Sequence, residues 1–175
     1  WPEPRRRPGP MHRLTIRPVD FDQAADTAAF LFLLDHYMRS PTGNGRPMDD
    51  ALRARLPAEL RRRPNVLSFI AWLDDEGGPR PAGLINCVEG FSTFAGRPLL
   101  NVHDIVVHHD FRRRGIARAL LAHAETVARQ RDCCKLTLEV LEGNRGAHRA
   151  YLEFGFQPYQ LDPAMGAALF MEKKL

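Results

Sequence analysis

The chain has 175 residues, of which 44% are hydrophobic and 26% are charged, and its formal net charge is +4. These values are typical of a single globular domain that is large enough to bury a core. A membrane-spanning helix is not predicted, because it needs about 20 apolar residues and the longest apolar run, AAFLFLL, covers only residues 28–34.

The positive charge is concentrated at the start of the chain. Four arginines and one glutamate give residues 1–13 a net charge of +3, which leaves the remainder close to neutral. We therefore expect residues 1–12 to be a disordered N-terminal extension, followed by one domain over residues 13–175. The extension has no apolar stretch of the kind found in secretory signals. Attraction to polyanions is then expected to be a property of the extension rather than of the domain.

The chain has three cysteines, Cys87, Cys133 and Cys134, which form neither a CxxC pair nor an even set. This pattern favours a reducing, cytoplasmic location in which the cysteines are small apolar residues. It argues against a structural zinc site or a disulfide framework.

Periodicity and turn signals predict a mixed α/β chain. In chain order we expect a strand at 14–19, a helix from Phe21 to Met38, a helix that starts at Asp49 or Asp50 and is broken by Pro57, strands at 65–73, 81–94 and 98–107, a helix at 114–131, a strand at 134–141, a helix at 146–154, and closing strands at 156–161 and 167–175. The strand–helix–strand unit at 98–141 predicts a parallel pair within the sheet.

The stretch DFRRRGIARALL at residues 110–121 places three arginines directly before Gly115 and an apolar helix pattern. Like charges at a helix start repel one another and the positive end of the helix dipole. A bound anion removes this conflict, because the first helical N–H groups lack partners, glycine admits a close approach and arginine forms charge-assisted bonds with phosphate. An exposed basic turn is the alternative interpretation of this stretch alone.

A second motif downstream supports the anion site. The two motifs together resemble those of the GNAT superfamily of acyl-CoA-dependent N-acetyltransferases: Arg112-x-x-Gly115-x-Ala117 is similar to its pyrophosphate loop, and Asn144-x-x-Ala147-x-x-x-Tyr151 with EFGF at 153–156 is similar to its later helix. The resemblance covers most of residues 14–175. It implies the GNAT fold: a mixed, mostly antiparallel central sheet, a parallel βαβ core that binds acetyl-CoA, and flanking helices. A Rossmann fold is disfavoured because the chain has no G-x-G-x-x-G motif near a first strand.

The resemblance implies acetyl-CoA as co-substrate and no metal. Ile105, Val106 and Val107 would offer backbone groups to the pantetheine arm and an N–H to the thioester carbonyl. The loop and the later helix would contact the pyrophosphate, the arm or the adenosine side through Arg112, Arg113, Arg114, Gly115, Ile116, Ala117, Arg118, Asn144, Ala147 and Arg149. The family often has glycine where this chain has Ala117, and one added methyl group should be tolerated.

Acetyl transfer to an amine requires a proton acceptor for the amine, an oxyanion donor and an acid for the leaving thiolate. The resemblance places Tyr151 as the acid that protonates the coenzyme A sulfur. His103 stands where polyamine-acetylating relatives have a glutamate, and a neutral imidazole, whose ordinary pKa is about 6.5, can accept the amine proton. Glu89 is a further candidate for the base or for binding a cationic acceptor. Structural roles are the alternative for all three: a packing tyrosine, a strand histidine and a solvated glutamate.

Two further histidines, His108 and His109, precede the arginines and are expected to be exposed, and no third ligand at a convincing spacing predicts a metal site. We expect the acceptor amine, a small molecule, to bind between residues 35–47 and the late loop at 161–169. A mildly acidic mouth there would be formed by Asp35, His36, Tyr37, Asp49 and Glu89. We expect no nucleic-acid or membrane partner, and the resemblance implies a possible homodimer.

The sequence thus predicts a cytoplasmic N-acetyltransferase that transfers acetyl from acetyl-CoA to a primary amine by direct attack. One alternative is a GNAT-fold domain that binds coenzyme A without turnover. Another is a basic nucleic-acid-binding protein, although no aromatic-rich RNA-binding motif accompanies the arginines.

Overall fold

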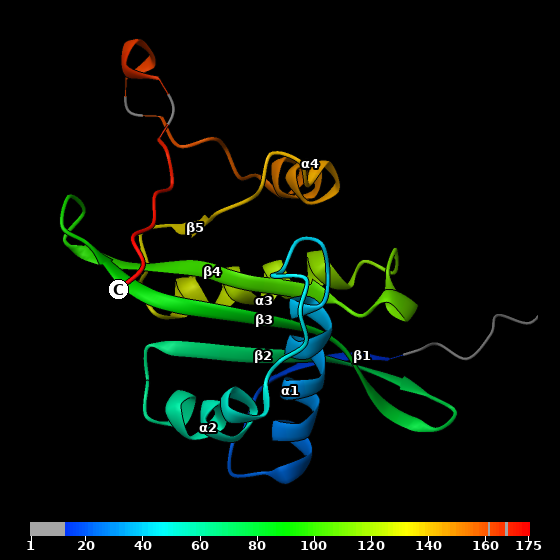
Figure 1. Cartoon of the computed structure of the whole chain (residues 1–175). Coiled ribbons are helices and arrows are strands. Elements are labelled where there is room, and N and C mark those ends of the chain that lie inside the picture. Colours follow the sequence, from blue (N-terminus) through cyan, green and yellow to red (C-terminus); the bar gives the residue numbers. More distant parts are fainter. Residues whose placement is uncertain (1–12, 161, 167) are drawn as a thin grey trace, which may run out of the picture.

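The structure is a computed structural model that describes residues 13–160, 162–166 and 168–175. Five strands form one sheet in the order β1-β2-β3-β4-β5, with helices on both faces (Figure 1). The elements are β1 (Leu14–Pro18), α1 (Ala24–Met38), α2 (Asp50–Arg61), β2 (Val66–Asp75), β3 (Gly78–Ser92), β4 (Arg97–Val107), the 3₁₀ turn η1 (His109–Phe111), α3 (Ile116–Gln130), β5 (Leu136–Leu138), α4 (Arg145–Phe154) and the 3₁₀ turn η2 (Pro163–Met165).

The sheet is antiparallel from β1 to β4, and β5 joins β4 in parallel. The parallel pair closes the predicted βαβ unit of β4, α3 and β5, so the predicted mixed sheet is confirmed. The middle of β2, residues 68–73, is buried without alternation. A continuous apolar run of this kind is expected for a strand that is covered on both faces.

Helices α1 and α2 pack on one face of the sheet, where Phe30 and Leu33 of α1 meet Ile70, Trp72 and Leu84. Helix α3 covers the other face, with α4 beside it. The buried residues of α3 recur at helical spacing: Ile116, Leu120, Leu121, Ala124 and Ala128. They pack against one side of β2, β3 and β4, and the side chains on the other side of these strands face α1. The sheet therefore separates two apolar cores. No helix among the described residues is long and apolar enough to span a bilayer.

The prediction that Pro57 breaks the second helix is wrong. Helix α2 runs without interruption through Pro57, and the Asp49 side chain caps it by accepting a hydrogen bond from the Leu52 amide at 2.7 Å. Leu56 and Leu60 of this helix pack against the α1 core. The cap and this tertiary packing offset the hydrogen bond that a proline removes from a helix.

The two closing strands predicted at 156–161 and 167–175 are absent from the described residues of those segments; Leu161 and Ala167 lie outside the description. Beyond Phe156 every described residue is exposed, including Tyr159, Phe170 and Met171. A strand forms only where a neighbouring edge accepts it, and Pro158 removes one ladder donor from the first segment. Strand β5 is also shorter than the predicted 134–141, so it offers little edge.

Candidate functional site

Strand β4 parts from β5 partway along its length. The parallel pairing joins Leu100–Val102 to Leu136–Leu138 and stops there, whereas β4 continues to Val107 with only β3 beside it. Among the described residues, the edge of β4 that faces β5 therefore has no strand partner at Ile105–Val107, although the Val107 carbonyl accepts a hydrogen bond from Arg112 Nε at 3.4 Å. Unpaired strand edges present N–H and C=O groups that can bind an extended ligand.

A bulge lies where the two strands part. In the β3–β4 register, Cys87 pairs with Val102 and Asn86 with Asp104, so His103 is an extra residue on β4. Val102 and Ile105 both pack in the α3 core, which leaves His103 and Asp104 together on the α1 face. Bulges often redirect side chains in this way next to active sites. His103 is exposed and Asp104 is half-buried.

A line of hydrogen bonds across three strands orients the Asp104 carboxylate. The Ser68 hydroxyl donates to Asn86 Oδ1 at 2.7 Å, and Asn86 Nδ2 donates to Asp104 Oδ2 at 3.0 Å. Ser68 and Asn86 are buried, so the line is a satisfied polar network beneath the α1 face. Tyr37 of α1 stands above it: burial raises the pKa of the Tyr37 hydroxyl, and the charge of Asp104 raises that pKa further.

The loop between β4 and α3 gathers positive charge around free helix amides. Phe111 is buried and anchors the loop, Arg113 has a φ of 61°, and Gly115 is the N-cap of α3 with a φ of 76°. No side chain caps this end, the first turn contains no acidic residue, and a Cβ at Gly115 would meet nothing within 4 Å. The loop therefore presents open, unpartnered N–H groups of the kind that bind phosphate.

Four exposed arginines surround this helix start: Arg112, Arg113, Arg114 and Arg118. Among the described residues, none of them has a carboxylate within ion-pair distance. Arg114 lies over the Phe111 ring at 5.6 Å, and Arg118 lies over Phe154 of α4 at 5.8 Å. The charge is thus held over apolar rings and remains available to an anion. Ile116 is buried and Ala117 is half-buried in the first turn of α3.

Helix α4 brings the second predicted motif toward this helix start. Asn144 is its N-cap, with Oδ1 accepting from the Ala147 amide at 3.3 Å. Tyr151, on the same helix, is half-buried in the α3 core with its ring centroid 5.9 Å from that of Phe156. Burial raises the pKa of Tyr151 to about 12, and Tyr37 contributes to that rise. Arg149 is exposed.

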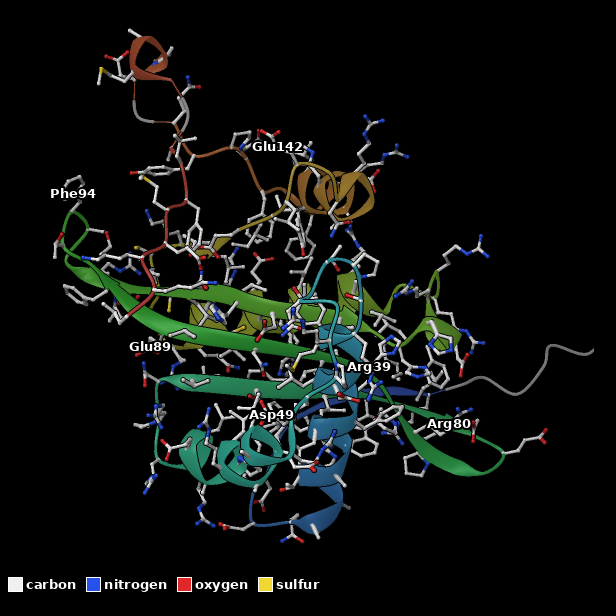
Figure 2. The ribbon with its side chains drawn as sticks, in the orientation of Figure 1. Arg39, Asp49, Arg80, Glu89, Phe94 and Glu142 are labelled. Atoms are coloured by element: carbon white, nitrogen blue, oxygen red, sulfur yellow. The ribbon has the colours of Figure 1, made fainter. Side chains whose placement is uncertain are left out.

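Glu89 is not brought together with these residues. Its carboxylate is hydrogen-bonded to Arg131, just after α3. Glu89 is two residues beyond Cys87, so it lies on the same side of the sheet as Cys87 and Ile85, which face α3. Figure 2 shows Glu89 toward one end of the sheet and Arg80 at the other, and Arg80 lies over the ring of Phe111 in the arginine loop. The ion pair with Arg131 favours a structural role for this glutamate.

The carboxylates predicted to form an acidic mouth for the acceptor are also mostly engaged in contacts within the protein. Asp35 accepts from the Met48 amide at 2.7 Å and from Arg39 at 2.8 Å, and Asp49 caps α2. The described part of the late loop stands away from α1, since its short 3₁₀ turn η2 (orange-red in Figure 1) projects past β5. Asp104, which is not among the residues predicted for the mouth, is the carboxylate that the structure places on the α1 face beside Asn86.

The prediction that His108 is exposed is wrong, whereas His109 is exposed as expected. The His108 amide donates to the Ala82 carbonyl at 2.9 Å, which continues the β3–β4 pairing, and its ring stacks on Phe32 of α1. His36 of α1 lies against both rings, so the structure supplies the third histidine that sequence spacing did not suggest. The contact joins residues more than seventy positions apart, and its only signal in the sequence is the presence of His36 near the end of a largely apolar helix.

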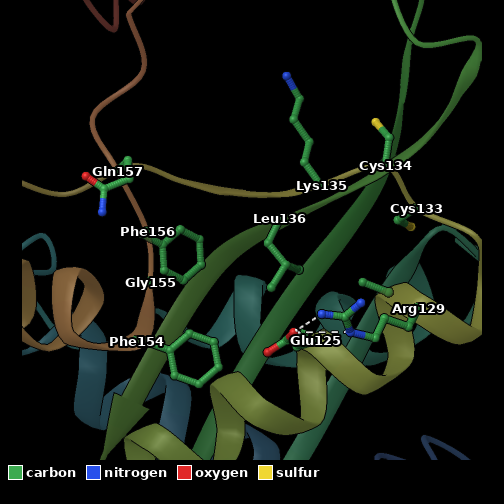
Figure 3. Close-up of a pocket in the computed structure, with 11 residues that line it drawn as sticks. Glu125, Arg129, Cys133, Cys134, Lys135, Leu136, Phe154, Gly155, Phe156 and Gln157 are labelled. Carbon is green, nitrogen blue, oxygen red and sulfur yellow. Dashed lines mark hydrogen bonds and ion pairs between the residues drawn. The ribbon is translucent and has the colours of Figure 1, made fainter.

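A cavity of about 370 Å³ lies elsewhere, between the end of α3, β5 and the residues after α4 (Figure 3). Its lining includes the ion pair of Glu125 with Arg129, together with Leu136, Phe154 and Phe156. None of the predicted site residues lines it. Of the described residues beyond Phe156, only Gln157 contributes to its lining. The anion loop and the polar line at Asp104 are thus a surface site distinct from this cavity.

The chain is thus an α/β protein in which a parallel strand pair parts beside an arginine-rich helix start. The chain belongs to the Acetyltransferase (GNAT) family, whose model matches residues 30–156.

Similar proteins carry acetyltransferase names. Thialysine N-epsilon-acetyltransferase of Caenorhabditis elegans is 33% identical over 86 residues, which are 49% of this chain and 51% of that protein. Streptothricin acetyltransferase of Streptomyces lavendulae is 41% identical over 66 residues, which are 38% of this chain and 35% of that protein. The matches therefore span about half of one relative and about a third of the other. The crystal structure of aminoglycoside N-acetyltransferase AAC(6′)-Iy in complex with CoA has a TM-score of 0.70 at 17% identity, covers 95% of this chain and 99% of that chain, and shares the fold.

Proposed function

We propose that this protein is an acetyl-CoA-dependent N-acetyltransferase that acts on a primary amine of a small molecule. The observation that carries the proposal is the open, arginine-lined start of α3 beside the unpaired edge of β4. The site offers an anion-binding helix start next to a polar backbone edge. This pair of features matches a ligand made of a pyrophosphate and an amide-containing arm. The family membership and the names of the relatives support the same activity.

Specific residues would hold acetyl-CoA in this proposal. The pyrophosphate binds the α3 amides from Gly115 onward, with Arg112, Arg113, Arg114 and Arg118 neutralising its charge. The pantetheine arm lies along Ile105–Val107, where a β4 amide polarises the thioester carbonyl. Asn144 at the start of α4 contacts the arm or the adenosine side, and Arg149 on the same helix adds a phosphate contact. The capping bond of Asn144 uses its side-chain oxygen, so its amide nitrogen is the group to contact the ligand.

The chemistry needs one group to accept a proton and one to provide it. The amine nitrogen forms a bond with the thioester carbon, a proton leaves the nitrogen for His103, and the carbon–sulfur bond breaks as the sulfur takes a proton from Tyr151. Because the pKa of Tyr151 is raised to about 12, the phenol keeps its proton at neutral pH and remains available as a donor. Asp104, oriented by Asn86 beside the bulge, attracts the cationic form of the acceptor.

The acceptor in this proposal is a small cationic amine that approaches from the α1 face, between Tyr37 and the β4 bulge. Asp104 accepts one hydrogen bond from Asn86, and its other oxygen has no partner among the described residues. The names of relatives with thialysine, streptothricin and aminoglycoside acceptors favour this class. Glu89 has no catalytic role in this proposal, because its carboxylate is paired with Arg131.

The test combines cofactor binding with a screen for turnover. Gly115→Glu should abolish acetyl-CoA binding in calorimetry, because it places negative charge in the phosphate cradle and strains a backbone with a φ of 76°. Gly96→Glu is the matched control, since Gly96 also has a positive φ, of 60°, in open space and lies in the distant β3–β4 turn. Retained affinity in Gly115→Glu refutes the placement.

Turnover is measured as free-thiol release against amines, amino acids, polyamines and aminoglycosides at several pH values. Acceptor-dependent release by the wild-type chain, lost in Gly115→Glu, supports the proposed enzyme. Acetyl-CoA binding without release across the whole panel instead supports a coenzyme A-binding domain that lacks turnover.

A further inference from the structure

Three histidine rings meet where the end of α1 lies against the end of β4. His36 comes from α1, His108 follows β4 and His109 begins η1. Each offers one ring nitrogen, and these nitrogens all lie within 4.8 Å of one another. The ring centroids of His36 and His108 are 4.5 Å apart, those of His108 and His109 4.2 Å, and those of His36 and His109 5.2 Å. Zinc bonds imidazole nitrogen at about 2.0–2.1 Å, so modest rotations of these side chains would bring all three nitrogens within reach of one ion.

The surroundings hold the cluster and leave it accessible. His108 is buried and stacks on Phe32 at 5.2 Å, whereas the His109 side chain is 62% exposed and opens the cluster to solvent. His36 Nε2 is buried and has no hydrogen-bond partner among the described residues. A buried ring nitrogen without a partner destabilises a fold, and a bound ligand removes that cost.

Imidazole binds a metal ion in its neutral form, and the charged groups around these three rings act on such an ion in both directions. Arg112 and Arg80 oppose a cation here. Asp110 favours one, because its carboxylate lies 3.1 Å from His109 Nε2 and 3.6 Å from His108 Nδ1.

We propose that His36, His108 and His109 form a zinc-binding site, with Asp110 as the carboxylate that completes or orients it. Three imidazoles with an open position are a common zinc ligand set, and a carboxylate beside a ligating histidine fixes its ring orientation. The ion would fasten α1, which bears Tyr37, to the loop that leads into the arginines. This site is independent of the proposed acetyl transfer, because it uses none of the residues assigned to acetyl-CoA.

The test is direct metal binding to the full chain, purified without added histidines and stripped with a chelator. Zinc is titrated against a chromophoric competitor, and cobalt is used as a spectroscopic probe, since tetrahedral cobalt absorbs strongly in the visible range. One equivalent should bind. His109→Ala and His36→Asn should each weaken zinc affinity about 10–100-fold or more, at least as much as loss of an outer-shell partner does. His148→Ala, at an exposed position on α4, is the matched control and should bind as the wild type does.

Thermal melting keeps the test decisive if His36→Asn does not fold. His109 is exposed, so His109→Ala is expected to fold, and zinc should raise the melting temperature of the wild type but not of this variant. The proposal is overturned if the wild type binds no stoichiometric zinc, if His109→Ala keeps wild-type affinity, or if His148→Ala loses affinity as strongly as His109→Ala. Loss of acetyl-CoA binding in Gly115→Glu leaves this result unaffected.

Discussion

At the scale of single residues, the environment of Tyr151 is compatible both with packing and with the acid role proposed for it. The residue packs in the α3 core beside Phe156, and burial raises its pKa to about 12. Packing fixes where the hydroxyl lies, and the raised pKa keeps it protonated. A motif in the sequence locates such a residue, but its burial and its proximity to Tyr37 follow from the packing of α4 against the sheet.

The first prediction concerns Tyr151→Phe. We expect kcat to fall about 100-fold, since the leaving sulfur loses its proton donor, while the Kd of acetyl-CoA is unchanged. Because the pKa is about 12, the hydroxyl stays protonated from pH 7 to 9, and the deficit should be constant over that range. Tyr159→Phe, at an exposed tyrosine, is the control. An unaltered kcat in Tyr151→Phe removes the residue from the acid role.

The second prediction concerns His103→Gln. The glutamine amide cannot accept the amine proton, so kcat/KM for the acceptor found in the screen should fall about 100-fold. The exposed side chain at the bulge makes a large change in melting temperature unexpected. His148→Gln serves as the comparison. A rate within about twofold of the wild type would contradict a base role for His103 and leave Asp104 as the nearest ionisable group.

The motif residues depend on their neighbours in the sequence, whereas other site residues depend on register or on contacts between distant segments. Asn144 caps α4 and Gly115 caps α3, so both lie at helix starts that a motif resemblance can locate, and their contacts with acetyl-CoA stay a prediction. The line from Ser68 through Asn86 to Asp104 requires three strands in one register, with a bulge at His103. A shift of one residue reverses the face of every side chain, and no local pattern reports such a shift.

At the scale of elements, β1 is fastened to α1 by an ion pair whose carboxylate is buried. Both terminal nitrogens of Arg17 donate to the Asp26 carboxylate, at 2.7 and 2.8 Å, and the Asp20 amide donates to it at 3.1 Å. The Asp26 side chain is 4% exposed, whereas that of Arg17 is 46% exposed and lies over the Trp72 ring. The pair positions the start of the helix that carries Tyr37 at its other end.

The third prediction is that Arg17→Met lowers the free energy of unfolding by about 1.5–3 kcal/mol at pH 7, because a buried carboxylate loses its charged partner. Arg17 holds the pKa of Asp26 below its ordinary value. This contribution is present above pH ~4, the ordinary value for Asp, and is lost as pH falls through the lowered folded-state pKa. Urea unfolding at pH 7 and at lower pH should therefore show a deficit that shrinks on acidification.

Arg61→Met is the matched control for that measurement. Arg61 pairs with Asp22 at 2.6 Å, but both side chains are more than half exposed. Exposed pairs contribute little, so the expected change is within about 0.5 kcal/mol. Equal deficits in the two variants would contradict a special role for the pair of Arg17 with Asp26.

Element positions followed closely from periodicity, as α1, α3 and the three long strands illustrate. Pro57 and the closing segments did not, because both outcomes are decided by tertiary contacts. Helix α2 tolerates its proline since Leu56 and Leu60 pack on the α1 core, and the residues after Phe156 form no described strand since no neighbouring strand pairs with them. Local propensity does not report either kind of contact.

At the scale of the whole molecule, charge is distributed unevenly between the start of the chain and the domain. Residues 1–13 hold a net +3 of the total +4. Within the described domain, many basic side chains pair with carboxylates, and the four arginines around the start of α3 are a separate, localised group. This arrangement fits a compact anionic ligand rather than a long polyanion.

The fourth prediction follows from that distribution. Any DNA or RNA binding by the full chain should weaken steeply between 50 and 200 mM salt and be lost when residues 1–10 are removed, because those residues supply much of the net charge. Fluorescence anisotropy with a labelled duplex measures the binding, and the shortened chain should keep its affinity for acetyl-CoA. Nucleic-acid binding that survives the truncation would instead assign it to the domain.

The parting of β4 from β5 has a consequence for how this protein can change through evolution. The main-chain groups along Ile105–Val107 are the same for every amino acid except proline, so most substitutions there leave this backbone edge intact. The α1 side of the same strand instead carries the side chain of Asp104, which lies near Tyr37 of α1, and single codon changes can replace either residue. In the proposed reaction, this strand would combine a mutation-tolerant edge for acetyl-CoA with a readily altered side for the acceptor, so that descendants could acquire new acceptors while the donor site is inherited unchanged.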